Sequence, residues 1–237
     1  MNYEMYGTGP DVLLLHGWGQ DLNSLRAIGD LLSKEYKVWL LDLPGFGKSL
    51  INYPYDLNDY VLELKTFINT NKIESPILIG HSFGCRVIIK YASKHHVGKL
   101  LLIDAAGIVK RSPLYYYKVY SYKSIRFILN ILGQKKLIER LRMKRSSNDY
   151  NDSSIIMKEV LKRIYIDIRG SLKEINAETL IIWGEKDDIT PLRDAKLMNK
   201  FIDQSGLVII PNAGHFPFLD TPNLFMKIIE SYLLEEV

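Results

Sequence analysis

The segment Pro76-Ile-Leu-Ile-Gly-His-Ser-Phe-Gly-Cys85 decides how this chain folds. The apolar run 77–79 indicates a buried strand, and helical character begins at residue 85 and continues to residue 94. Between them lies a serine with a glycine two positions before it and another two positions after it. A strand that turns into a helix at such a serine is a nucleophile elbow, a tight turn that lifts the Ser82 hydroxyl out of the sheet.

The pattern Gly-x-Ser-x-Gly is weak when it stands alone, so its context must distinguish an elbow from an ordinary turn. Strand-like and helix-like segments alternate along the chain and are joined by short turns. This alternation predicts an α/β fold, a doubly wound and mostly parallel sheet with sites at the carboxyl ends of its strands. The expected strands are 2–6, 12–15, 37–43, 77–79, 100–103, 180–183 and 207–210, and the expected helices are 22–32, 57–69, 85–94, 192–201 and 222–234.

Length and composition limit the class of protein. A chain of 237 residues with 47% hydrophobic residues fits one globular domain, or one domain with an insertion. A single cysteine excludes an internal disulfide and a cysteine-based zinc site. The first residues lack the basic flank and apolar core of a signal peptide, and no apolar run approaches the roughly 20 residues that span a bilayer. We therefore expect a cytoplasmic protein without a transmembrane segment.

A serine hydroxyl needs a base within hydrogen-bonding reach, and histidine is the usual one because its pKa lies near neutral pH. Of the five histidines, His95 and His96 lie beside lysine at an expected helix end and read as surface residues. The elbow directs His81 away from its neighbour Ser82, and His16 fits a loop-supporting role. His215 follows the last expected strand and is the best candidate base.

The base in turn needs an acid that fixes its tautomer. The stretch after the penultimate expected strand, Trp183-Gly-Glu-Lys-Asp-Asp-Ile-Thr-Pro191, offers Glu185, Asp187 and Asp188. The end of the strand and the glycine three residues earlier favour Asp187. Asp188 is a competitor for this role, and Asp104 is a more remote one.

Acyl transfer also requires two N–H donors for the developing oxyanion. One should be the backbone amide of Phe83, directly after the serine. The other should come from the loop His16-Gly-Trp-Gly19 after the first core strand, where Trp18 is best placed. No cofactor or metal site is expected. Gly45-Phe-Gly-Lys-Ser49 resembles the end of a phosphate-binding loop, but Asp42 occupies the position of the required first glycine.

Over nearly its whole length the chain resembles proteins of the α/β-hydrolase fold, in which nucleophile, acid and base follow one another in this order. In that family the residues matching Ser82, Asp187 and His215 form the triad, and those matching Trp18 and Phe83 supply the oxyanion donors. The sequence departs from the family at Cys85, where a small residue is usual, and at Asp188, where proline is frequent, so the choice of acid stays open. The resemblance rests on motifs at 16–19, 42–49, 80–84, 184–187 and 213–215.

Residues 107–169 separate two core strands and lack strand character. In the family such an insertion is a helical cap over the site, so we expect a core formed by 1–106 and 170–237, with helical pieces of the cap at 115–132, 135–143 and 155–166. Between residues 107 and 147 the chain has eleven Lys or Arg against one Glu, a formal charge of +10 that leaves −6 for the rest. A solvated helix face explains this charge simply.

The charge also suggests an anionic partner: an acidic acyl-carrier protein, an anionic acyl thioester or an anionic lipid surface. Nucleic acid is not expected, because no recognised binding motif accompanies the charge. We therefore expect a serine hydrolase, similar to carboxylesterases, that cleaves a small-molecule ester or thioester through an acyl-enzyme on Ser82. Carbon–carbon bond hydrolases and haloperoxidases share the triad, and a ligand-binding sensor that retains it is an alternative of another class.

Overall fold

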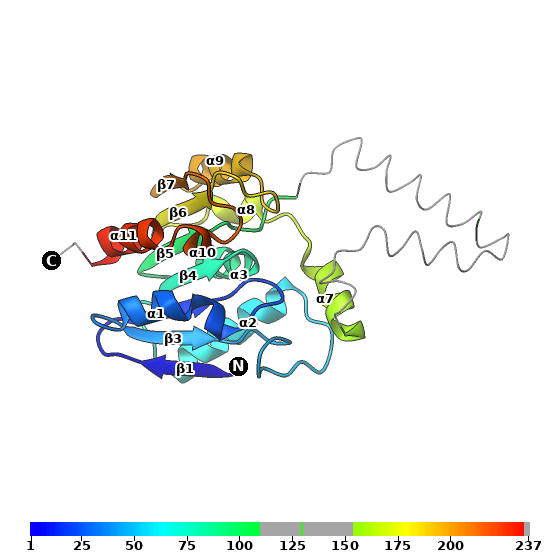
Figure 1. Cartoon of the computed structure of the whole chain (residues 1–237). Coiled ribbons are helices and arrows are strands. Elements are labelled where there is room, and N and C mark those ends of the chain that lie inside the picture. Colours follow the sequence, from blue (N-terminus) through cyan, green and yellow to red (C-terminus); the bar gives the residue numbers. More distant parts are fainter. Residues whose placement is uncertain (110–128, 130–153, 235–237) are drawn as a thin grey trace.

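The apolar runs form one seven-stranded sheet with the strand order β1-β3-β2-β4-β5-β6-β7 (Figure 1). This computed structural model describes residues 1–109, 129 and 154–234. β1 pairs with β3 in antiparallel fashion, and all other neighbours are parallel, so the predicted mostly parallel sheet is confirmed. The strands are β1 (Tyr3–Tyr6), β2 (Asp11–Leu15), β3 (Lys37–Leu41), β4 (Ile77–His81), β5 (Lys99–Ile103), β6 (Glu178–Gly184) and β7 (Ser205–Ile210).

Helices cover both faces of the sheet. The described helices are the 3-10 helix η1 (Leu22–Leu25), α1 (Arg26–Leu32), α2 (Leu57–Thr70), α3 (Phe83–Ala92), α7 (Ile155–Ile164), α8 (Arg169–Leu172), α9 (Leu192–Phe201), α10 (Pro217–Asp220) and α11 (Pro222–Leu233).

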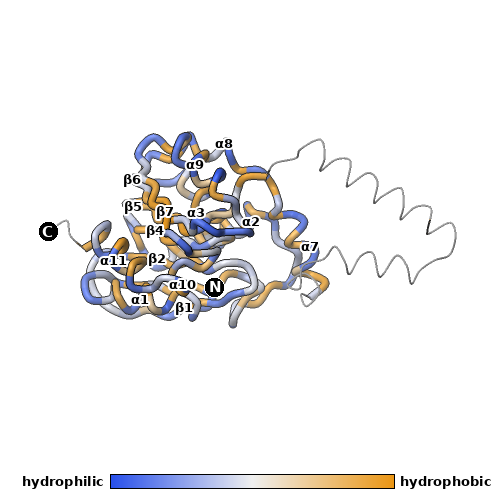
Figure 2. The backbone as a smooth tube through the Cα atoms, turned by 45° about the horizontal axis from the view of Figure 1, so that its top comes forward, coloured by the Kyte–Doolittle hydropathy of each residue, from blue (hydrophilic) through white to orange (hydrophobic). Residues whose placement is uncertain are grey.

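Side chains of the strands alternate between two hydrophobic cores. In β2, Leu13 and Leu15 belong to the core under α2, α3 and α9, whereas Val12 and Leu14 belong to the core under α1 and α11. Strands covered on both faces are apolar at successive positions, which is why they read as uninterrupted hydrophobic runs. Hydrophobic residues gather along these strands in the interior of the molecule (Figure 2).

Some boundaries differ from the expected ones. The expected helix 22–32 is divided into η1 and α1, and α3 begins directly after the elbow serine, two residues earlier than expected. The short helices α8 and α10 were not expected, because one turn is too short to give a periodic pattern.

The chain leaves the sheet after β5 and returns before β6 at one point. The amide of Ile168 donates a hydrogen bond of 3.0 Å to the carbonyl of Gly107. Within the intervening stretch, α7 corresponds to the helical piece expected at 155–166, and the pieces expected at 115–132 and 135–143 lie outside the described residues. Among the helices of the described segments, none combines the length and apolar character needed to cross a bilayer.

Candidate active site

Ser82 lies at the junction of β4 and α3 with φ +48° and ψ −106°, a backbone conformation that residues other than glycine rarely adopt. The end of β5 and the residues that follow it hold Ser82 there. Its amide donates to the carbonyl of Ile103 at 2.9 Å, and its carbonyl accepts from the amide of Ala106 at 3.1 Å. The strained backbone expected of a nucleophile elbow is present at this residue.

Both flanking glycines are required by close backbone contacts. A Cβ atom added to Gly84 would lie 2.2 Å from the carbonyl oxygen of Leu15 in β2. A Cβ atom added to Gly80 would lie 2.7 Å from the amide nitrogen of Cys85 in α3. The elbow therefore packs so tightly against strand and helix that neither position has room for a side chain.

His215, in the loop after β7, meets the elbow serine. Its Nε2 lies 2.9 Å from Ser82 Oγ, and the residue is 7% exposed. The Nε2 of His81 lies 2.8 Å from the backbone carbonyl of His215. Since a carbonyl can only accept, His81 donates this bond and positions the loop that carries His215.

Asp187 lies on the other side of the imidazole, with Oδ2 2.8 Å from His215 Nδ1. Its Oδ1 accepts from the amides of Ile189 at 2.8 Å and Thr190 at 2.9 Å, and the Thr190 hydroxyl donates to Oδ2. Burial opposes ionisation, but the hydrogen bonds from His215 and Thr190 outweigh it and lower the pKa of Asp187 to about 2. Asp187 is thus a carboxylate at neutral pH, whereas Asp188 is exposed.

Asp104, the remote alternative, is fully buried after β5. Its Oδ1 accepts from the amide of Gly184 at 2.9 Å, and its Oδ2 has no hydrogen-bond partner among the described residues. Burial raises the pKa of Asp104 to about 9, and the neighbouring carboxylate of Asp187 acts in the same direction. Asp104 is therefore a neutral carboxyl at pH 7 and differs in charge from Asp187.

The two expected oxyanion donors flank the serine. Trp18 and Phe83 line the same pocket as Ser82, and their rings contact each other with centroids 5.7 Å apart. Neither backbone amide donates to an acceptor within the described part of the chain, so both N–H groups are available to a ligand. His16 stabilises the loop that carries Trp18, because its Nδ1 donates to the Gly17 carbonyl at 2.7 Å and its Nε2 accepts from the Leu43 amide at 3.0 Å.

The loop that resembles a phosphate-binding motif encloses a carboxylate of its own. The side chain of Asp42 accepts from the amides of Lys48 and Leu22, both at 2.8 Å. A Cβ atom on Gly47 would lie 2.3 Å from that carboxylate. This glycine therefore gives the Asp42 side chain the room that a Cβ atom would take.

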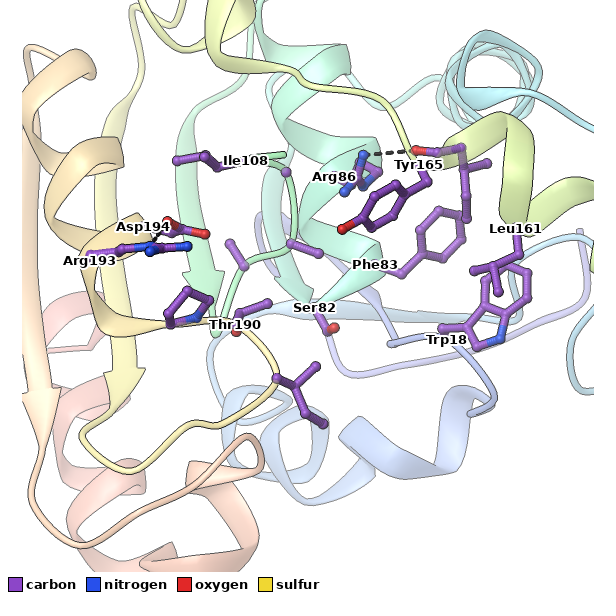
Figure 3. Close-up of a pocket in the computed structure, with 16 residues that line it drawn as sticks. Trp18, Ser82, Phe83, Arg86, Ile108, Leu161, Tyr165, Thr190, Arg193 and Asp194 are labelled. Atoms are coloured by element: carbon purple, nitrogen blue, oxygen red, sulfur yellow. Dashed lines mark hydrogen bonds and ion pairs between the residues drawn. The ribbon is translucent and has the colours of Figure 1, made fainter. Parts of the chain in front are cut away.

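A pocket of about 360 Å³ opens above Ser82 (Figure 3). Its lining includes Arg86 from α3, Leu161 from α7 and Thr190 from the loop that carries the acid. The sequence argument missed Arg86 and Thr190. The sequence does carry a signal for Arg86, because it is the one charged residue within positions 83–89, directly after the elbow.

Asp104, Asp187 and His215 offer oxygen and nitrogen atoms within 4.8 Å of one another, a spacing that a metal ion would need. Both nitrogens of His215 are already engaged by Ser82 and Asp187. The contacts present are therefore those of a hydrogen-bonded chain from Asp187 through His215 to Ser82, and Ser82 lines the pocket.

Comparisons with known proteins agree with this arrangement. A family model described as "alpha/beta hydrolase fold" matches residues 10–222. The chain is 30% identical to a pimeloyl-[acyl-carrier protein] methyl ester esterase of Wigglesworthia glossinidia brevipalpis, over 98% of this chain and 96% of that protein. Among solved structures it resembles an esterase from Exiguobacterium antarcticum (25% identity, 97% and 94% of the chains, TM-score 0.75) and, in fold, MenH from S. aureus (23% identity, 99% and 98%, TM-score 0.75).

The hydrogen bond between Asp187 and His215 gives the first prediction. Asp187→Asn should lower the turnover of an activated ester by roughly 10⁴-fold, the scale of a histidine held in the wrong tautomer. Asp188→Asn is the same substitution at the exposed adjacent residue, and it should leave turnover within about threefold of wild type. The reverse result in steady-state kinetics would assign the acid to Asp188.

The burial of Asp104 gives a second prediction, on stability. The folded protein keeps the Asp104 proton up to about pH 9, whereas the unfolded chain loses it near pH 4. Between these values the folded state binds more protons, so the contribution of Asp104 to stability falls as pH rises. Asp104→Asn removes this ionisation, keeps the shape, and places a residue that tolerates the φ of +43°.

In urea titrations, the free energy of unfolding of Asp104→Asn relative to wild type should therefore rise by more than about 1 kcal/mol between pH 5 and pH 8.5. A difference that stays constant over this range would mean that Asp104 is already ionised in the folded protein.

Proposed function

The chain belongs to the α/β-hydrolase family and is a hydrolase that acts on esters, and we propose that it cleaves carboxylic esters or thioesters through an acyl-enzyme on Ser82. The observation that carries this proposal is the continuous line of contacts from Asp187 through His215 to the Ser82 hydroxyl, 2.8 Å and 2.9 Å long. The hydroxyl faces a pocket of about 360 Å³ that can receive an acyl group.

In the proposed first half-reaction, Ser82 Oγ attacks the carbonyl carbon and its proton passes to His215 Nε2. The amides of Trp18 and Phe83 donate to the oxyanion that forms. Asp187, ionised at neutral pH, holds the proton on His215 Nδ1 and stabilises the imidazolium. When the tetrahedral intermediate collapses, the imidazolium protonates the leaving alcohol or thiol.

In the second half-reaction, His215 removes a proton from water, and the resulting hydroxide attacks the acyl-enzyme carbonyl. Collapse of this intermediate returns the proton to Ser82 and releases the carboxylic acid. We further propose that residues 107–169 form a cap over the pocket. Leu161 and Tyr165, within that stretch, line the pocket and support this assignment.

Substitution of the serine tests the proposal. Wild type should hydrolyse p-nitrophenyl acetate or butyrate over many turnovers, and Ser82→Ala should lose at least about 10³-fold of that rate, because it removes the hydroxyl that contacts His215 Nε2. Ser93→Ala, a matched change at the far end of α3, should retain it. A fluorophosphonate probe should add to the peptide that contains Ser82, as read by mass spectrometry. Tight ligand binding with at most one turnover would instead identify a sensor.

We also propose that the basic segment 107–147 binds an acidic acyl-carrier protein that presents the substrate. Two observations support this partner: the formal charge of +10 in that segment, and the relative that is named for a carrier-linked methyl ester. Attraction between opposite charges would raise the rate of encounter and would weaken as salt screens it.

For a methyl ester attached to acyl-carrier protein, kcat/KM should fall about tenfold between 50 mM and 500 mM salt, and hydrolysis of p-nitrophenyl butyrate should not. Neutralising Lys135, Lys136, Arg140, Arg142, Lys144 and Arg145 should remove this salt dependence. The matched control neutralises six exposed lysines elsewhere, namely Lys34, Lys65, Lys94, Lys196, Lys200 and Lys227. Equal effects of both sets, or salt-independent turnover of the carrier ester, would contradict carrier docking.

A further inference from the structure

Arg86 is a buried cation in the wall of the candidate active-site pocket. It lies four residues after Ser82 on α3, which is about one helical turn, or about 6 Å along the helix axis. The residue is only 5% exposed, and it lines the same pocket as Ser82. Burial lowers the pKa of Arg86 to about 10, so the guanidinium is still charged at neutral pH.

The contacts of Arg86 use only part of its hydrogen-bonding capacity. Its Nη1 donates to the carbonyl of Ile164 at 2.8 Å and to the carbonyl of Ile166. A guanidinium has five N–H donors, and the described residues provide no acceptor for Nε or Nη2. The ring of Tyr165 lies 6.0 Å from Cζ and covers another side of the group.

No carboxylate among the described residues forms an ion pair with Arg86. The carboxylate that acts on it electrostatically, Asp167, is itself bound to Arg169 with a closest contact of 2.5 Å. The pocket also contains Asp194, which is paired with Arg193 at 3.4 Å. In the view of Figure 3 that pair lies to the left of both Ser82 and Arg86.

A buried cation that lacks an anionic partner is costly unless something supplies one. Two backbone carbonyls satisfy part of this requirement at the C-terminal end of α7, where a cation is favourable. The remaining donors form a planar fork of the kind that binds a carboxylate through two oxygens. A substrate that carries its own carboxylate would complete the site.

We propose that Arg86 is the anion-binding residue of the substrate pocket and that the preferred substrates are esters with a free carboxylate a few carbons from the scissile carbonyl. This inference rests on the proposed function, because it assumes that Ser82 attacks an ester bound in this pocket. The half-esters of short dicarboxylic acids have the required chemistry, with the ester at Ser82 and the free acid at Arg86.

The test compares matched pairs of substrates on the full-length protein. The methyl half-esters of succinate, glutarate and adipate are each compared with the analogue in which a primary amide replaces the carboxylate. For at least one chain length, wild-type kcat/KM should favour the anion by tenfold or more. Arg86→Met should lower this preference by about 10- to 100-fold, mainly through KM, and should change turnover of the amide less than threefold.

Two further variants separate charge from structure. Arg86→Lys keeps the cation and should retain part of the preference for the anion. Arg163→Met should leave the preference unchanged, because Arg163 also donates to a backbone carbonyl, that of Pro54 at 3.0 Å, but is exposed and outside the pocket. If Arg86→Met lowered kcat/KM equally for the anionic and the amide esters, Arg86 would only stabilise the position of α7. That result would overturn the proposal.

Wild type alone provides a second measurement if Arg86→Met does not fold. Free glutarate should inhibit p-nitrophenyl acetate hydrolysis competitively, with an inhibition constant at least tenfold lower than that of the neutral diamide. Equal inhibition, or equal turnover of both members of every ester pair, would overturn the assignment of Arg86 and leave the esterase function intact. If no ester is turned over and no fluorophosphonate adds to Ser82, both proposals fail.

Discussion

The positive φ of Ser82 is the constraint on which the site depends. The carbonyl of Leu15 and the backbone of α3 approach the elbow so closely that only glycine fits on either side of it. Hydrogen bonds to Ile103 and Ala106 then fix the strained residue to the neighbouring strand. The position of the hydroxyl is thus determined by packing against β2, α3 and β5, and the geometry of the candidate site depends on the same contacts as the fold.

Much of the fold was predictable because strands buried on both faces of a parallel sheet appear in the sequence as uninterrupted apolar runs. The apolar runs of the central strands gave their positions, and α9 matched its expected range of 192–201. The start of α3 was missed because Phe83 and Gly84 look like turn residues, whereas the elbow here has no spacer between strand and helix. One-turn helices such as α10 were missed because their pattern is too short to repeat.

Sequence could predict which residues meet at the candidate site where chemistry demands particular residue types at strand ends, as with Ser82 and His215. Sequence left the acid open between Asp187 and Asp188, since adjacent carboxylates differ only in where the turn directs them. The structure brings Asp187 to the imidazole and leaves Asp188 exposed. The neutral state of Asp104 could not be predicted from the sequence, because it arises from burial among residues that are distant in sequence. Asp104 and Asp187 are the same type of residue, yet they carry different charges within one cluster.

The hydrogen bond from Ile168 to Gly107 has a consequence for how such proteins diverge. Because the excursion between these residues departs from and rejoins the sheet at a single neck, its length is decoupled from the register of β5 and β6. Met157, Val160 and Ile164 of this excursion pack into the core that contains Leu13 and Leu15. Exchanging the excursion for another segment would therefore change both the wall of the pocket and part of that core. Substitutions in this stretch that keep the packing of those three side chains would alter what the pocket meets while the strand ends stay in place.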